Sequence, residues 1–153
     1  MREDEELVES LIRSQQADLC AATGGRVVVR EDGSGVTCLL AAIQDPFLSS
    51  LGSLDWGDKV VGRAAALLFS LLRARSVFGS TMSAGAQEVL AAAGIPYRCD
   101  ATIPVVLNRT GTGPCPLERA VSKTVDPHAA FDVLAGLHAG GPAMQSSPGK
   151  ETT

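Results

Sequence analysis

The chain has 153 residues, a usual length for one domain, and its 45% hydrophobic and 20% charged residues are typical of a globular protein. Its net charge of −4, with no basic run and only 4% aromatic residues, excludes nucleic acid as the main partner. The acidic start MREDEELVES lacks the apolar run of a signal peptide, and no segment is apolar over the length of a membrane span. We therefore expect a cytoplasmic protein that makes no contact with a membrane.

The first part of the chain predicts two helices around a hairpin. Residues 5–16 have the apolar spacing of an amphipathic helix. Residues 26–41 contain two β-branched runs around an Asp-Gly pair, a pattern that predicts a β-hairpin. Residues 45–52 begin with Asp-Pro and end with Gly, which predicts a short helix.

The middle of the chain alternates helices and strands. Residues 58–74 are apolar nearly all round and predict a helix buried against a sheet, with Asp58 as its N-cap. Residues 76–82 predict a short buried strand, after which Ser83 caps another helix. Residues 98–107 are extended but interrupted by proline, which is typical of an edge strand.

Two further helices, which begin at Pro116 and at Pro127, complete the pattern. A hairpin followed by alternating helices and strands predicts an α/β domain with three layers, α/β/α, and a mixed sheet. This domain should span residues 1–139. Residues 140–153 are rich in Gly, Pro and Ser and predict a disordered C-terminal tail.

The segment GTGPCPLE, residues 111–118, is the candidate for a binding site. Glycines let the backbone approach a ligand, and the segment leads into a helix N-terminus, where free N–H groups favour an anion. Lysine in the first turn of the helix at residues 58–74 would also hold an anion. We therefore predict that a phosphate-bearing, nucleotide-like small molecule binds there, without a further cofactor. The predicted ligand-binding residues are Lys59, Asn108, Arg109, Gly111, Thr112 and Gly113.

Three alternatives stay open. Cys115 opens a helix, where the pKa of a thiol is lowered, so it would serve as the nucleophile of a transferase or hydrolase, assisted by Glu118 or Asp58. The same segment would also serve as a tight turn before a capped helix, with no functional role. Finally, the chain would act as a non-catalytic subunit or scaffold if its apolar edges mediate homo-oligomerisation.

Two motifs carry a resemblance to a known family. The segments DKVVGRAAALL and NRTGTGPCPLE, in this order, resemble a prokaryotic family that is defined only as a domain of unknown function. The family pattern is D-K-x-V-G-K-A-A-A followed by N-R-x-G-T-G-x-C-P-x-E, and the resemblance covers residues 26–121. Arg63 stands where the family usually has lysine, which keeps the charge and changes its geometry.

The resemblance implies a cytidine-deaminase-like fold. In zinc deaminases one helix begins with H-x-E or C-x-E and the next with P-C-x-x-C. Laid on this chain, the first motif falls on residues 58–60 and the second on residues 82–86. Val60 then replaces the catalytic glutamate, while Ser83 and Ala86 replace the two cysteines. We therefore expect no metal site and no zinc-dependent deamination, because a catalytic zinc needs three protein ligands.

Overall fold

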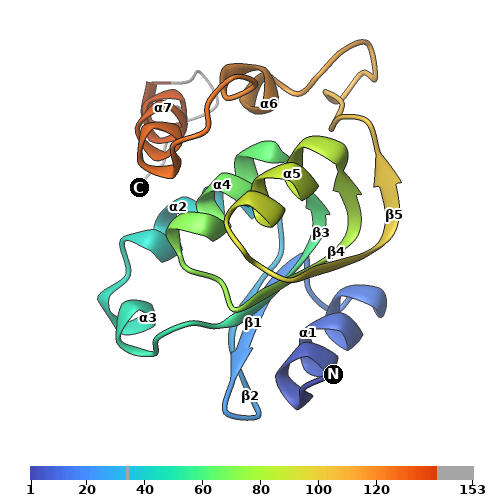
Figure 1. Ribbon diagram of the computed structural model, residues 1–153, viewed down its shortest axis with the longest axis vertical. Helices are drawn as coiled ribbons and strands as arrows, with labels where there is room; N and C mark the ends of the chain where they lie inside the picture. Colours follow the sequence, from blue (N-terminus) through green and yellow to red (C-terminus); the bar gives the residue numbers. More distant parts are fainter. Residues whose placement is uncertain (34, 141–153) are drawn as a thin grey trace.

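The structure is a computed structural model that describes residues 1–33 and 35–140, and its centre is a five-stranded sheet in the order β2-β1-β3-β4-β5 (Figure 1). The strands are β1 (Leu19–Thr23), β2 (Arg26–Glu31), β3 (Asp55–Val61), β4 (Ser76–Ser83) and β5 (Tyr97–Ile103). The helices are α1 (Glu3–Arg13), α2 (Gly35–Ile43), α3 (Pro46–Ser50), α4 (Arg63–Leu71), α5 (Ala84–Ala92), α6 (Pro116–Ala120) and α7 (Pro127–Gly140). Strand β1 is antiparallel to β2 and β3, whereas β3, β4 and β5 are parallel. The predicted α/β class with a mixed sheet is confirmed.

Helices lie on both faces of the sheet. In Figure 1, α1 stands apart from α2, α4, α5 and α7, which gather on the other face. Val8 and Ile12 of α1 are buried in a small cluster with Cys20 and Phe78 of the sheet. This arrangement gives the three layers that the order of elements predicts, with α1 as one layer and the remaining large helices as the other.

Helix α4 is the centre of the larger core. All six residues from Ala64 to Phe69 are buried, and the helix packs against α2, α5 and α7 as well as β3. Trp56 of β3 packs on Phe69, with ring centroids 5.6 Å apart. A helix surrounded on all sides needs apolar residues on all sides, which explains the uniform composition of this segment.

The predicted hairpin at residues 26–41 is wrong, because the hairpin lies earlier in the chain. Its turn is Gly24-Gly25, with φ of 60° and 78°, and Thr23 pairs with Arg26 across it. Glycine is suited to a two-residue turn with positive φ at both positions. The segment predicted as the second strand forms α2, because Leu39 and Leu40 are buried against the helical core.

The predicted helix start at Asp58 is also wrong. Strand β3 continues to Val61, and α4 begins at Arg63 with Gly62 as its N-cap. The strand depends on close packing under α1: a Cβ at Gly57 would lie 2.9 Å from Ile12 Cγ1. Asp58 is therefore a strand residue rather than a helix cap.

The later elements agree with their predictions. Strand β4 leads into α5, whose N-cap Ser83 accepts a hydrogen bond from the Ala86 N–H at 3.1 Å. Strand β5 is an edge strand of the sheet and ends one residue before Pro104. The predicted tail lies outside the described residues, apart from Gly140 at the end of α7. In the part of the chain that the structure describes, no helix has the length and hydropathy needed to cross a membrane.

Candidate functional site

Three residues from two distant parts of the chain line one pocket of about 160 Å³ beside the carboxyl end of β3. They are Asp58 of β3, Cys115 immediately before α6, and Glu118 of α6. Gly35, Val60 and Val106 also contribute to the wall. The structure thus brings together the three residues that the sequence suggests for catalysis. The carboxyl ends of parallel strands are where ligands bind in open α/β sheets.

Asp58 is the most unusual group of this pocket. The residue is only 4% exposed, and its Oδ2 atom has no hydrogen-bond partner among residues 1–33 and 35–140. The pKa of the carboxyl group is raised from 3.8 to about 8, mainly by burial; the N–H groups of Val60 and Lys59 lower it, and the nearby charge of Asp18 raises it. Near neutral pH the carboxyl group is therefore mostly protonated, so that it can donate or accept a hydrogen bond.

A glycine next to Asp58 leaves space for this carboxyl group. A Cβ atom at Gly35, the first residue of α2, would lie 2.7 Å from Asp58 Oδ2. Any other residue at this position would force the carboxyl group to move. The free oxygen thus lies where α2, β3 and the pocket meet, and the absence of a side chain at Gly35 keeps that space open.

Glu118 has a different task, because both its oxygens are occupied. Its Oε1 accepts a hydrogen bond from the Arg63 N–H at 2.6 Å, and its Oε2 accepts one from the Ala64 N–H at 2.9 Å. These are free N–H groups at the start of α4, where a negative charge is favourable. Gly62 permits this approach, since a Cβ there would lie 2.5 Å from Glu118 Oε1. The anion at this helix N-terminus is the protein's own carboxylate.

Arg63 makes a second set of contacts between the start of α4 and the region of α6. Its guanidinium group donates to the carbonyl oxygens of Val121, at 2.9 Å, and of Thr124 in the segment that follows α6. Arg63 and Glu118 belong to the two separate sequence motifs. Their contacts give the two motifs one structural purpose, which is to hold α6 against the start of α4.

The glycine-rich turn before α6 is stabilised by its own hydrogen bonds. Asn108 Oδ1 accepts from the Thr112 N–H at 3.0 Å and from Thr110 Oγ1 at 3.1 Å, and Gly111 has a φ of 72°. Asn108 and Thr112 therefore serve the turn itself. Among the side chains that the structure describes, none pairs with Arg109, which is exposed.

Two features of this geometry bear on the predicted anion site, which stays a prediction. Helix α6 has only five residues, and Cys115, its N-cap, makes no capping bond through its side chain. Lys59 is exposed on β3 and is not among the residues that line the pocket of Asp58 and Cys115.

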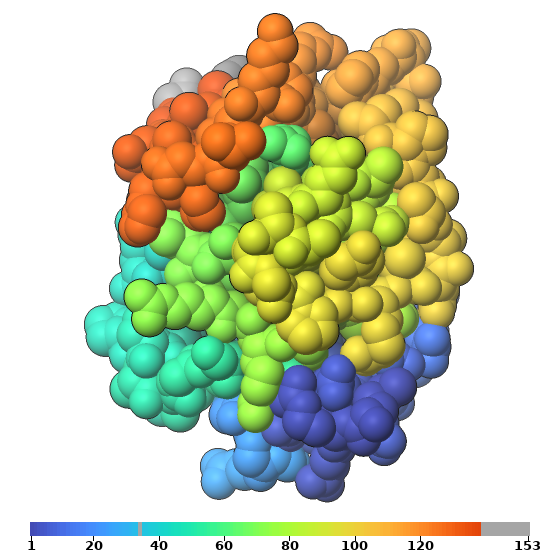
Figure 2. Space-filling view, in the orientation of Figure 1, coloured from blue at the N-terminus to red at the C-terminus, as the bar shows by residue number. Residues whose placement is uncertain are grey.

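An apolar groove adjoins the pocket and shares Val60 and Val106 with it. The groove has a volume of about 400 Å³, and Thr81, Ile103 and Leu107 are among its walls. Val60 is 41% exposed and Leu107 54% exposed, so the groove presents apolar surface on both of these residues. In Figure 2, the segment from β5 to α6, coloured yellow to orange, forms a continuous ridge along one side of the molecule. No local sequence pattern marks this groove, although the strand ends that form it are recognisable in the sequence.

The described residues contain no cluster of three His, Cys, Asp or Glu side chains suited to a metal ion. The deaminase motifs also fit the structure only in part. Ser83 does stand at a helix start, but Asp58 lies inside a strand, so the proposed alignment of residues 58–60 with a helix start is wrong. Glycine at N-caps is common enough that Gly62 could have indicated the true start of α4.

The comparisons with known proteins agree on one family. The model of the TM1506 family, described as a domain of unknown function (DUF1893), matches residues 7–137. The crystal structure of a DUF1893 family protein (TM1506) from Thermotoga maritima has a similar fold, with a TM-score of 0.78 and 20% sequence identity over 89% of this chain and 90% of that one. No curated protein is significantly similar to this chain. The likeness to cytidine deaminases stays a prediction.

Replacing Glu118 tests its role at the start of α4. The substitution Glu118→Ala should lower the free energy of unfolding by about 1–3 kcal/mol, because two backbone N–H groups lose their acceptor. Urea denaturation measures this change. The control is Glu88→Ala on the exposed side of α5, which should change stability by less than about 0.5 kcal/mol. Equal effects of both substitutions would show that the hydrogen bonds of Glu118 to the start of α4 add no stability.

Asp58 should make stability depend on pH in an unusual direction. Because folding raises its pKa from 3.8 to about 8, the protonated group stabilises the fold fully below about pH 4, and this contribution is lost as pH rises through about 8. Asp58→Asn should remove this titration, so that the variant gains stability relative to the native protein between about pH 5 and about pH 9. Urea denaturation at several pH values compares the two. Parallel pH profiles would contradict the raised pKa.

Proposed function

We propose a small-molecule-binding function for this chain, which belongs to the family of the domain of unknown function DUF1893. The ligand would be nucleotide-like, with the edge of its base in the pocket at Asp58 and its ring on the apolar groove. The observation that carries this proposal is the buried carboxyl group of Asp58, whose free oxygen borders a pocket. A buried polar atom without a partner is costly, and such groups cluster at functional sites.

The chemistry of Asp58 favours a base as ligand. A protonated carboxyl group offers one donor and one acceptor, and an ionised one offers acceptors only. The edge of a nucleobase that presents an N–H group beside a ring nitrogen complements the protonated form. A pocket of about 160 Å³ has space for such an edge rather than for a whole nucleotide. The remainder of the ligand would extend into the adjoining groove.

The groove and the turn suit the other parts of such a ligand. Val60 and Leu107 offer apolar surface on which a flat ring can pack. Arg109 follows Leu107 by two residues, and its exposed guanidinium group would pair with a phosphate. The side chains of Asn108 and Thr112 are hydrogen-bonded to each other. In this proposal Arg109 therefore supplies the positive charge that pairs with the phosphate.

Blocking the groove tests the proposal. Thermal shift measurements with bases, nucleosides and nucleotides should identify at least one stabilising ligand. Val60→Lys should abolish the shift, because a lysine would occupy the shared wall of pocket and groove. Arg109→Ala should weaken a nucleotide about tenfold and leave its nucleoside unchanged, because only the phosphate contact is lost.

The control is Val27→Lys, since Val27 is a strand valine that is 39% exposed, nearly the same as Val60. It lies on β2 and should leave ligand binding intact. A panel in which no compound stabilises the protein, or a shift that survives Val60→Lys, would refute the proposal.

Cys115 supports a second candidate function, because it lines the same pocket. In this case the thiol of Cys115 would lose its proton to water and its sulfur would form a bond to an electrophilic carbon of the ligand. The bond from that carbon to the leaving group would break, and protonated Asp58 would give its proton to the leaving group. Two of the other cysteines are poorly suited to this chemistry. Burial raises the pKa of Cys20 to about 12, and burial together with the charge of Glu31 raises the pKa of Cys38.

Thiol labelling tests this candidate separately. Iodoacetamide at neutral pH should modify Cys115 before Cys20 and Cys38, as followed by peptide mass spectrometry, and a groove ligand should slow the modification. Cys115→Ala should keep ligand binding, which separates a nucleophile from a binding group. Faster labelling of Cys38 or Cys99, or no protection by a bound ligand, would remove the support for a nucleophilic role.

A further inference from the structure

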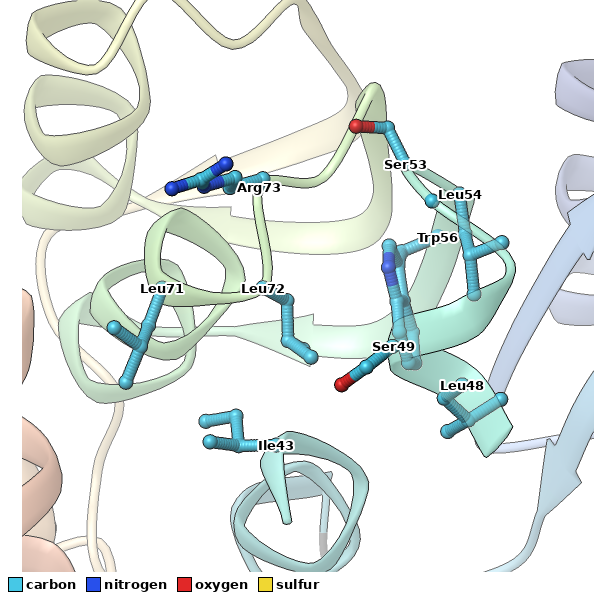
Figure 3. A pocket seen from close by; sticks show the side chains of 10 residues that line it. Ile43, Leu48, Ser49, Ser53, Leu54, Trp56, Leu71, Leu72 and Arg73 are labelled. Atoms are coloured by element: carbon cyan, nitrogen blue, oxygen red, sulfur yellow. The ribbon is translucent and has the colours of Figure 1, made fainter. Parts of the chain in front are cut away.

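A second pocket lies at the opposite end of β3, between α2, α3 and the last turn of α4. Its volume is about 390 Å³ (Figure 3). Ile43, Leu48, Leu54 and Leu72 form its apolar walls, and Trp56 stands among them. None of its lining residues belongs to the pocket of Asp58 or to the adjoining groove. The two regions are therefore independent.

Trp56 places a free hydrogen-bond donor at this pocket. The residue is 1% exposed, and its indole N–H donates to no acceptor in residues 1–33 and 35–140. The N–H of a buried tryptophan normally has a partner. Figure 3 shows the ring bordering the pocket, with the hydroxyl group of Ser49 turned toward the space between Trp56 and Ile43. The lining of the pocket thus combines a large apolar surface with two donors.

Arg73 stands at the rim of the same pocket in a strained conformation. Its φ is 56°, and it follows the C-cap of α4 at a position where helices favour glycine. Gly52 and Gly94 take the equivalent positions after α3 and α5, while Gln15 takes it after α1. No described residue pairs with the guanidinium group of Arg73, which is exposed and has several rotatable bonds. The chain therefore has a cationic residue at a position where glycine would give a more stable backbone.

The polar side chains at this pocket are all able to donate, and none is acidic. They are the indole of Trp56, the guanidinium group of Arg73 and the hydroxyls of Ser49 and Ser53. We propose that this pocket binds a small organic acid, with its apolar body against Trp56 and its carboxylate paired with Arg73. One arginine matches the single charge and planar shape of a carboxylate, to which it can donate two parallel hydrogen bonds.

Trp56 is the one tryptophan of the chain, so tryptophan fluorescence reports on this pocket. Titration with phenylacetate should change the tryptophan emission and saturate. The neutral isostere phenylacetamide should bind at least about tenfold more weakly, because it cannot form the ion pair. No change in emission with millimolar phenylacetate, or equal binding of the amide, would refute the proposal.

Arg73→Gly separates a binding role from a structural role. Glycine should raise the melting temperature, because it removes the strain of the positive φ, while the affinity for phenylacetate should fall at least about tenfold. The matched control is Gln15→Gly, which relieves the same strain at the end of α1, on the other face of the sheet. It should leave the affinity unchanged. Native affinity in Arg73→Gly would refute the ion pair.

Trp56→Phe keeps an aromatic ring and removes the N–H donor. Because this variant lacks the fluorophore, saturation-transfer NMR on phenylacetate measures its binding. The affinity should fall several-fold. The control is Leu54→Met, which keeps an apolar side chain at the pocket wall and should leave the affinity unchanged. Unchanged binding in Trp56→Phe would show that the indole N–H does not contact the acid.

Discussion

The carboxylate of Glu118 at the start of α4 is the contact on which the candidate site depends. It satisfies the N–H groups of Arg63 and Ala64, and Arg63 in return donates to the backbone after α6. This pair of contacts holds α6 beside β3, so that Cys115 comes next to Asp58 at the pocket wall. It acts together with the buried residues Val121, Ala130 and Leu134, which pack the segment from α6 to α7 into the core. The negative charge at the N-terminus of α4 is thus the carboxylate of Glu118. Asp58 is the carboxyl group that stays available at the pocket.

Strand β3 connects the two proposed binding regions. Trp56 packs on Phe69 and Asp58 lies against Gly35, both in the helical layer, whereas Gly57 lies under α1. Trp56 borders the pocket at the amino end of the strand, and Asp58 borders the one at the carboxyl end. Asp58 contributes a buried oxygen with no described partner, and Trp56 contributes its indole N–H. A single strand face therefore presents a donor to one pocket and a titratable oxygen to the other, and the two can be tested by separate substitutions.

Some residues of the two sequence motifs hold the structure together, and others stay available to a ligand. Gly62, Arg63 and Glu118 join the motifs to each other, and Asn108 with Thr112 shapes the turn between β5 and α6. Asp58, Cys115 and Arg109 are the members that this framework leaves available to a ligand. The family match over residues 7–137 and the similar fold of the Thermotoga maritima protein concern the framework. The chemistry of the site depends on the remaining side chains.

The sequence by itself determined the α/β class, strand β4, helix α5 with its cap Ser83, and the grouping of Asp58, Cys115 and Glu118 as candidates. These features follow from local signals: apolar periodicity, capping residues and glycine before or after a helix. Only the tertiary structure decided that residues 35–43 form a helix, that Asp58 lies in a strand, and that Glu118 binds the start of α4. Each of these depends on a partner far away in the chain: the helical core for α2, close packing of α1 on Gly57 for β3, and Gly62 for Glu118. The burial that raises the pKa of Asp58 is likewise a property of the assembled layers, which no local pattern contains.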